Sequence, residues 1–390
     1  MLNGPFSPWP SFTDEEANAA RDVLLSNKVN YWTGQEGRDF EREFAAFADS
    51  AFAIAVANGT VALDLALKGL GIGEEDEVIV TPRTFLASVS SIVTAGATPV
   101  FAEVDRDSQN ITPETVREVL TPRSKAIVCV HLAGWPCDMD GFRALADEFG
   151  LYLIEDCAQA HGAKYKGQSV GTLGDVGCWS FCQDKIMTTG GEGGMVTTND
   201  RALWSRMWSF KDHGKSWEAV YEREHPPGFR WLHDSFGTNW RMMEIQAAIG
   251  RIQLKRMPEW HKARNRNARQ IWNTARQLPG LRVPDIPESI EHAAYKCYVF
   301  VETGNRDAVM KALNEQGVPC FSGSCSEVYL EKAFDGTGWR PEKRLAVARE
   351  LGETSLMFLV HPTLTQAEID KTCEVLTQVM LDNERDHLKD

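Results

Sequence analysis

The sequence has no apolar run long enough to cross a membrane, and residues 1–5 have neither the basic nor the apolar region of a secretion signal. It also has an excess of acidic residues: 41 Lys and Arg stand against 55 Asp and Glu, and the formal net charge is -14. Binding to a phosphate backbone or to anionic lipid depends on clustered Lys and Arg. We therefore expect a cytoplasmic protein that has no nucleic acid or membrane partner.

The nine cysteines are an odd number and show no paired CxxC spacing. This pattern indicates neither a disulfide framework nor a zinc site, so we expect no structural metal and a reducing compartment. Cys157 is expected to be a small core residue rather than a nucleophile, because free cysteine is among the most buried residue types.

The GxGxxG motif of dinucleotide-binding folds is also missing, since the first strand leads into Asn58-Gly59-Thr60. Its absence counts against a Rossmann-type dehydrogenase. The chain has 390 residues and an ordinary soluble composition, with 43% hydrophobic and 25% charged residues. This length suggests two domains, which we place at residues 1–255 and 256–390.

Apolar or β-branched segments alternate with amphipathic helical segments in the first half of the chain. This alternation predicts an α/β domain with a largely parallel sheet that is covered by helices on both faces. The predicted strands are residues 53–57, 77–80, 99–104, 126–130 and 151–154. The later part predicts a helical region over residues 241–277, broken or bent near Pro258, and then a smaller α+β domain.

Ligands of parallel α/β sheets bind beyond the carboxyl ends of the strands. Lys185 follows a strand at residues 177–181 that looks exposed, and it precedes the glycine-rich run 188–194. Asp156 ends the buried strand at 151–154. A lysine on such a loop, paired with an acid at a strand end, is what an enzyme needs to hold pyridoxal phosphate as a Schiff base.

A carboxylate beside the pyridine nitrogen of this cofactor keeps that nitrogen protonated. Glu155 competes with Asp156 for the role, but side chains alternate along a strand, so only one of the two faces the cleft. Asn58-Gly59-Thr60 opens a helix, and its amides could bind the cofactor phosphate or form a plain N-cap. Ser180 could reach the same phosphate from its strand end. Phe85 could stack on the ring or belong to the core.

Four segments together resemble the DegT/StrS sugar aminotransferases, a family of fold-type I enzymes that depend on pyridoxal phosphate. The segments are residues 57–63, 154–163, 180–194 and 237–248. They keep the order and spacing of the family's motifs over most of residues 10 to 260. The fold expected from the resemblance has a large domain with a mainly parallel, seven-stranded type of sheet and a smaller C-terminal domain.

The resemblance implies pyridoxal 5'-phosphate as cofactor, with pyridoxamine 5'-phosphate as intermediate. It makes Lys185 the imine-forming lysine and the general acid and base. The other implied cofactor contacts are Asp156 at the ring nitrogen, Gln159 near the 3'-oxygen, Phe85 on the ring, and Gly59, Thr60, Val61 and Ser180 at the phosphate. Asn239 lies in a loop like the one that the family donates across a dimer, which implies a homodimer with shared active sites.

Two positions depart from the family pattern. The run Thr189-Gly190-Gly191-Glu192 has one glycine more than the usual Thr-Gly-Glu, and Arg83 stands where an aromatic residue is often found. A relative within the family that has histidine in place of the lysine performs dehydration, so Lys185 favours transamination over a pyridoxal-phosphate-dependent sugar dehydratase.

The resulting hypothesis is an aminotransferase that moves an amino group from an amino acid, L-glutamate by the resemblance, to a nucleotide-linked keto-deoxysugar. Such a product would serve a cell-surface polysaccharide or a glycosylated metabolite. A cyclitol ketone is the alternative acceptor, and a cofactor-binding scaffold without turnover is the alternative class. The sequence determines neither the nucleotide nor the aminated carbon. It leaves His161 and His213 open as sugar contacts or as structural residues.

Overall fold

We describe the protein from a computed structural model, which describes residues 4–225, 227–228 and 230–387. Residues 1–3, used above to judge a secretion signal, lie outside the described residues. Within the described part of the chain, no helix combines the length and the apolar character that a bilayer span needs.

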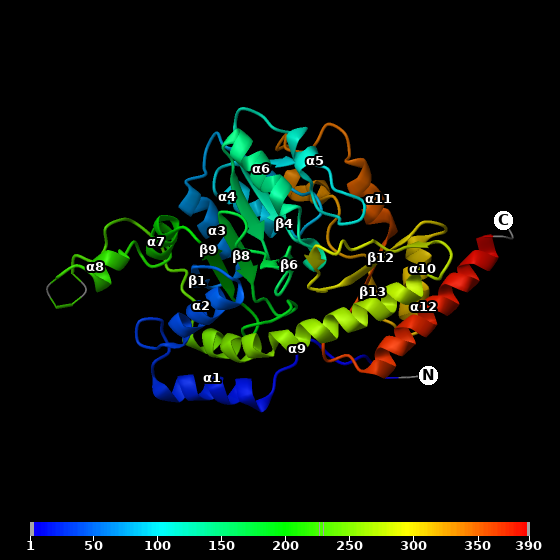
Figure 1. Cartoon of the computed structure of the whole chain (residues 1–390), viewed down its shortest axis with the longest axis horizontal. Helices are drawn as coiled ribbons and strands as arrows, with labels where there is room; N and C mark the ends of the chain where they lie inside the picture. Colours follow the sequence, from blue (N-terminus) through cyan, green and yellow to red (C-terminus); the bar gives the residue numbers. More distant parts are fainter. Residues whose placement is uncertain (1–3, 226, 229, 388–390) are drawn as a thin grey trace.

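A seven-stranded sheet forms the centre of the larger half of the molecule (Figure 1). Its strand order is β1 (Phe52–Val56), β9 (Gly194–Thr198), β8 (Val176–Ser180), β5 (Tyr152–Asp156), β4 (Ser124–Val130), β2 (Glu77–Val80) and β3 (Thr98–Phe101). Strand β9 runs antiparallel to both of its neighbours, and all other pairs are parallel. The predicted, mainly parallel α/β sheet is therefore confirmed.

Helices cover both faces of this sheet, because alternate strand residues point to opposite sides. Ile54 and Val56 pack with one set of helices, whereas Ala53 and Ala55 pack on the opposite face. The first set contains α3 (Gly59–Leu70), α4 (Ala87–Thr94) and α7 (Arg201–Phe210). The second face is covered by α2 (Glu36–Phe47), α5 (Pro113–Arg117), α6 (Met139–Phe149) and α9 (Glu244–Ala275).

Strand β8 corrects one expectation from the sequence. Residues 177–181 look exposed in the sequence, but every residue of β8 is buried. The cause is its position between β9 and β5, with helices over both faces, so that small and aromatic residues such as Gly177 and Trp179 are enclosed. A Cβ at position 177 would lie 2.5 Å from the Cα of Gly171, which shows how tightly a loop packs on this strand.

The C-terminal part forms a second, antiparallel sheet with its own core. Its strand order is β10 (Leu281–Arg282), β12 (Cys297–Val301), β14 (Ser355–Phe358) and β13 (Cys320–Phe321), and α10 (Arg306–Glu315), α11 (Ala346–Thr354) and α12 (Gln366–His387) pack around it. Smaller elements are α1 (Asp14–Ser26), α8 (Trp217–Tyr221), a sheet of β11 (Ile290–Glu291), β6 (Lys164–Tyr165) and β7 (Gln168–Ser169), and the 3-10 turns η1 (Leu132–Gly134), η2 (Val328–Leu330) and η3 (Lys332–Phe334).

Helix α9 joins the two halves and runs without a break through Pro258 (Figure 1). The prediction of a break there is wrong, and the alternative, a bend near Pro258, stays a prediction. Met257 packs into the core of the large sheet and Ile271 into the core of the small one, so tertiary contacts on both sides of Pro258 stabilise the helix against the local cost of proline. The domain boundary at 255/256 falls inside this helix and stays a prediction.

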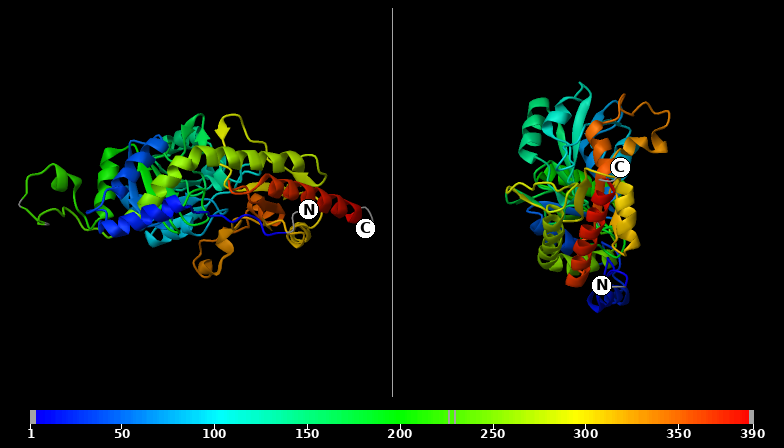
Figure 2. Two further views of the ribbon diagram at one scale, coloured as in Figure 1. Left: turned by 90° about the horizontal axis from the view of Figure 1, so that it is seen from below. Right: turned by 90° about the vertical axis from the view of Figure 1, so that its right-hand side faces the viewer.

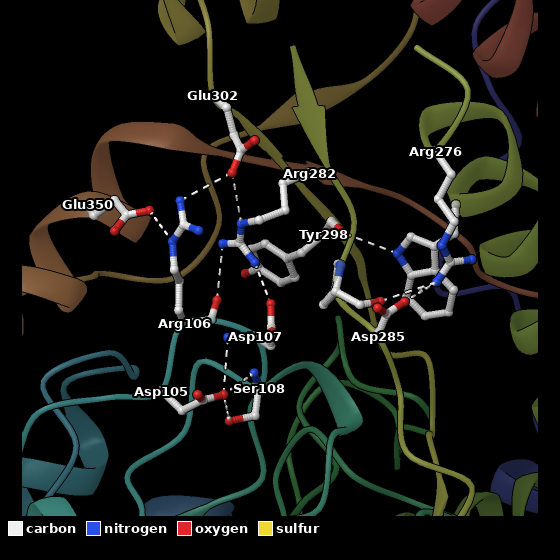
Figure 3. A network of polar contacts seen from close by, with 12 residues as sticks. Asp105, Arg106, Asp107, Ser108, Arg276, Arg282, Asp285, Tyr298, Glu302 and Glu350 are labelled. Carbon is white, nitrogen blue, oxygen red and sulfur yellow. Dashed lines mark hydrogen bonds and ion pairs between the residues drawn. The ribbon is translucent and has the colours of Figure 1, made fainter. Parts of the chain in front are cut away.

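Charged residues link the two halves on the surface (Figure 3). Arg106, in the turn that follows β3, donates to Glu302 at 3.2 Å and to Glu350 at 2.6 Å. Arg282 of β10 donates to Asp107 at 2.5 Å and lies 4.2 Å over the ring of Phe300. Exposed ion pairs are individually weak, so this network orients the halves more than it holds them together.

Arg83 provides the buried link between the halves. Its guanidinium is fully buried and donates to Gln109 at 2.8 Å, to Ser326 at 2.6 Å and to Ser355 at 3.2 Å. Burial lowers the pKa of Arg83 to about 10, so it is still charged at neutral pH. The position that departs from the family pattern is thus a hydrogen-bonded tie from the loop after β2 to the second sheet.

We expect the substitution Arg83→Met to lower the free energy of unfolding by about 1–3 kcal/mol, because it leaves the buried Gln109 oxygen without its donor. Urea unfolding followed by circular dichroism measures this change. Arg349→Met, at an exposed arginine of α11, is the control and should have little effect. Equal stability of the two variants would contradict this account.

Candidate active site

A cavity of about 840 Å³ lies at the carboxyl ends of β5 and β8. Eight of the nine predicted site residues line it: Gly59, Thr60, Val61, Phe85, Asp156, Gln159, Ser180 and Lys185. They come from segments far apart in the sequence, so the parallel sheet brings them together. A larger groove of about 1270 Å³ along α9 contains none of them.

Lys185 follows β8, and its side chain is only 15% exposed. Its ammonium nitrogen lies 5.3 Å from the centre of the Tyr295 ring and 4.0 Å from the Asp184 carboxylate. The indole of Trp9 donates to the backbone oxygen of Lys185 at 2.8 Å. Both the N-terminal segment and the C-terminal part therefore hold this lysine at the cavity.

Asp156 is the last residue of β5 and is 6% exposed. One of its oxygens accepts a hydrogen bond from the Ser88 hydroxyl at 2.7 Å, and the other accepts from the amide of Ala158 at 3.1 Å. Ser88 lies on α4 and was not predicted from the sequence. These contacts fix the carboxylate at the cavity wall.

Glu155 points to the opposite face of the sheet, as strand alternation requires. Its oxygens accept from the amides of Gly171 at 2.8 Å, Leu173 at 2.8 Å and Gly174 at 2.6 Å, and one lies 2.9 Å from a ring nitrogen of His131. With its acceptor positions occupied in this way, Glu155 ties a loop to the sheet. Of the two acids, Asp156 is the one that lines the cavity, and its role at the ring nitrogen stays a prediction.

His131, Glu155 and Cys157 are the one group of possible metal ligands found among the described residues. Glu155 already accepts the hydrogen bonds given above, and burial together with the carboxylates of Glu155 and Asp156 raises the pKa of the Cys157 thiol well above its usual value. A protonated thiol is a poor metal ligand and a poor nucleophile. Cys157 is fully buried, as expected for a core residue, and Glu155 ties a loop to the sheet.

The start of α3 approaches β8 closely. Asn58 caps the helix by accepting from the amide of Val61 at 2.9 Å, which leaves the first-turn amides of Gly59 and Thr60 for an anion. A Cβ at position 59 would lie 2.5 Å from the Cβ of Ser180. Only glycine allows this approach, which brings the helix N-terminus and the Ser180 hydroxyl to the same end of the cavity.

A hydrogen bond from the backbone sets the orientation of the Gln159 side-chain amide. Its side-chain oxygen accepts from the amide of Ala133 at 2.8 Å, so its NH₂ group is available as a donor at the cavity. Phe85 stands at the cavity mouth and is 68% exposed, so it is not a core residue. An acid for a ring nitrogen, a donor for a ring oxygen, a lysine and an anion site are the features that pyridoxal phosphate requires, and the residues present fit it.

The backbone conformation explains why an additional glycine follows Lys185. Gly190 and Gly191 have φ of +90° and +126°, a region that favours glycine. The Thr188 hydroxyl accepts from the Gly191 amide at 3.2 Å, and the Thr189 hydroxyl donates to the Glu192 oxygen at 2.5 Å. The longer run therefore forms an ordered turn.

The second sheet and the residues next to it contribute cavity residues that sequence reasoning missed, among them Tyr295, Lys296 and Tyr298. The Tyr295 hydroxyl donates to Asp184 at 2.5 Å, and the Lys296 ammonium lies 4.9 Å from the centre of the Tyr295 ring. Burial, together with the nearby Arg264, lowers the pKa of Lys296 to about 8. No local pattern in the sequence marks these residues, because they reach the site only through packing of the two halves.

Asn239 and the two histidines do not line the cavity. Asn239 is exposed and pairs through its backbone with Asp212. His161 is buried against Trp179 and Phe181, and burial lowers its pKa to about 3, so the ring is neutral. His213 is exposed on the segment beside Asn239.

A family model described as the DegT/DnrJ/EryC1/StrS aminotransferase family matches residues 10–377 of the chain. The chain belongs to this family. The resemblance seen in the sequence and the aminotransferase activity that it implied are therefore confirmed. The family depends on pyridoxal phosphate, in agreement with the fit of the residues described above.

The chain is similar to several characterised proteins. An aminotransferase from Psychrobacter cryohalolentis has a solved structure with a TM-score of 0.96 and 62% identity, over 97% of this chain and 100% of that one. The UDP-N-acetyl-3-dehydro-alpha-D-glucosamine 3-aminotransferase of Acidithiobacillus ferrooxidans is 36% identical over 92% of this chain and 94% of its own length. The dTDP-3-amino-3,4,6-trideoxy-alpha-D-glucose transaminase of Streptomyces venezuelae is 34% identical over 91% and 90%.

We expect Gly59→Ala to weaken cofactor binding by roughly tenfold or more, because the new methyl group collides with Ser180 and displaces the helix N-terminus. Titration of the apoenzyme with pyridoxal phosphate, followed by visible absorbance, measures the affinity. Gly73→Ala is the matched control, since a Cβ there meets only the Ala95 oxygen at 3.7 Å. Wild-type affinity in Gly59→Ala would show that the close approach does not shape the phosphate site.

Proposed function

We propose that this aminotransferase transfers an amino group from L-glutamate to a nucleotide-linked keto-deoxysugar. The observation that carries the proposal is the convergence of Lys185, Asp156 and the start of α3 on one cavity. The transferase chemistry needs all three, and each has a separate structural reason for its position.

The residues of the chain have distinct roles in this reaction. Bound pyridoxal phosphate supplies an electron-accepting ring that makes the α-carbon of the amino acid acidic. Asp156, held by Ser88, would keep the ring nitrogen protonated, and the Gln159 amide would donate to the ring oxygen. Lys185 would provide the covalent link to the cofactor and move the proton at the α-carbon as general acid and base. Gly59, Thr60 and Ser180 would hold the phosphate, with Val61 next to them in the cavity lining.

The names of the relatives support the acceptor class. One relative is named for a UDP-linked sugar and another for a dTDP-linked sugar, and both names describe amino transfer at carbon 3 or a 3-amino product. The common feature is a sugar linked to a nucleoside diphosphate, and we propose the same class here. The product would enter polysaccharide or glycosylated-metabolite biosynthesis. A cyclitol ketone is the competing acceptor.

The test is a panel of UDP-, dTDP- and GDP-linked keto sugars and one cyclitol ketone, each incubated with L-glutamate and the holoenzyme. We expect mass spectrometry to detect an amino product from a nucleotide-linked ketone and none in the Lys185→Ala variant, because the covalent lysine is lost. Lys262→Ala, at an exposed lysine of α9 outside the cavity, is the matched control and should retain activity. Amination of the cyclitol alone would overturn the proposed acceptor.

We also propose a homodimer in which Asn239 completes the phosphate site of the partner. The segment around α8 projects from the molecule (Figure 2) and carries the exposed side chains Trp231 and Phe236, the latter 99% exposed. Large exposed apolar side chains on one segment are typical of an interface. Asn239, next to them and outside its own cavity, is then available to a second subunit.

The nine free cysteines support the proposed cytoplasmic location.

We expect Phe236→Asp to shift the protein from dimer to monomer in analytical ultracentrifugation and to reduce activity together with dimer content, because the charge is costly in an apolar interface. Asn239→Ala should stay dimeric and bind the cofactor roughly tenfold more weakly, through loss of one polar contact to an anion. Phe149→Asp, at another exposed aromatic residue, is the control. A monomeric wild type with full activity would exclude shared sites.

A further inference from the structure

A second cavity of about 350 Å³ adjoins the site just described. The two cavities share four lining residues: Asp184, Tyr295, Lys296 and Leu359. The N-terminal segment 5–9 forms one wall of the second cavity, and Arg264 of α9 forms another. None of the roles assigned above uses this space.

Arg264 is the feature of this cavity that lacks an explanation. The residue is 2% exposed, and its Nε and Nη2 atoms have no hydrogen-bond partner. Its one hydrogen bond runs from Nη1 to the Tyr295 backbone oxygen at a long 3.3 Å, and its guanidinium lies 5.0 Å from the centre of the Trp9 ring. A buried guanidinium with unused donors is costly unless an anion occupies the space before it.

The ionisable groups around the cavity favour an anion. Burial lowers the pKa of Arg264 to about 9, so it is charged at neutral pH. Lys296 adds a second cation, and the pKa of His361 is lowered by burial and by Arg264 to about 3, so that ring is neutral. Asp184 is the one acid in the lining, and its carboxylate already accepts from the Tyr295 hydroxyl and lies beside Lys185. The lining therefore carries an excess of positive charge.

The positions of the two cations, relative to the reacting amine of Lys185, indicate which anion fits the second cavity. Lys296 lines both cavities and shares the Tyr295 ring with Lys185, where the amine reacts, whereas Arg264 lines only the second cavity. An anion that spans them has one charge next to the reacting amine and a second charge farther away. A dicarboxylic amino acid has this arrangement, and a cavity of about 350 Å³ is too small for a nucleotide.

We infer that Lys296 and Arg264 bind the two carboxylates of a dicarboxylic amino donor, Lys296 the carboxylate next to the amine and Arg264 that of the side chain. The inference rests on the proposed function and names the element that selects the donor. Guanidinium binds carboxylate through two parallel hydrogen bonds, and Nε and Nη2 form such a pair. The indole of Trp9 lies over the guanidinium and lines the second cavity.

The experiment compares L-glutamate with L-glutamine, which has the same shape and lacks the side-chain charge. The readout is the change in visible absorbance when the donor alone is added to holoenzyme. We expect Arg264→Met to lower the apparent affinity for L-glutamate by roughly 10- to 100-fold and to leave that for L-glutamine within about threefold. The KM of the keto sugar should not change. Arg269→Met, an exposed arginine on the same helix, is the matched control.

A measurement without turnover separates binding from folding. Glutarate should raise the thermal midpoint of the wild-type holoenzyme and have little effect on Arg264→Met. If that variant does not fold, Arg264→Lys and the comparison of glutarate with inorganic phosphate on the wild type decide the question. Four results would each overturn the inference. In the wild type these are equal use of both donors and stabilisation by phosphate alone. In Arg264→Met they are equal losses of affinity for both donors and a raised KM for the sugar. If no amino acid changes the spectrum, it is the proposed function that fails.

Discussion

The parallel pairing of β4, β5 and β8 is the constraint on which the site depends. It places the carboxyl ends of these strands at one edge, so that Asp156 and Ser180 end their strands on the same side of the sheet. Alternation along β5 then separates two adjacent acids: Asp156 lines the cavity, and Glu155 holds a loop through backbone amides on the other face. A register shift of one residue would turn Asp156 away from the cavity and Glu155 toward it, and the loop that Glu155 holds would lose its acceptor.

Residues of the second sheet and its neighbouring segments complete the cavity that the large sheet forms in part. Arg83 links the loop after β2 to β14, and the surface pairs of Arg106 and Arg282 orient the two halves. This docking brings Tyr295 and Lys296 to the cavity that Asp156 also lines. The link combines directed hydrogen bonds, which fix orientation, with apolar packing, since Tyr298, Phe300 and Leu351 share one core cluster with residues of the large sheet.

The sequence predicts those parts of the fold and the site that depend on local order. The strands of the parallel sheet and the residues at their ends follow from periodicity and loop chemistry. Burial of β8 and continuity of α9 through Pro258 do not, since they come from layers packed on both faces and from two separate cores. Ser88 and Tyr295 are also missed, because each reaches its partner through tertiary packing alone.

The distribution of charge connects these observations to the reaction. Asp156 accepts hydrogen bonds from neutral donors, whereas Lys296 and Arg264 line the second cavity, in which Asp184 is the one acid. Cations that are close together and poorly solvated raise the energy of the empty site, and an arriving anion relieves that cost. The proposed anionic donor would then be favoured next to Lys185, whereas Asp156, the proposed partner of the ring nitrogen, lines only the first cavity and stays apart from the donor's side chain.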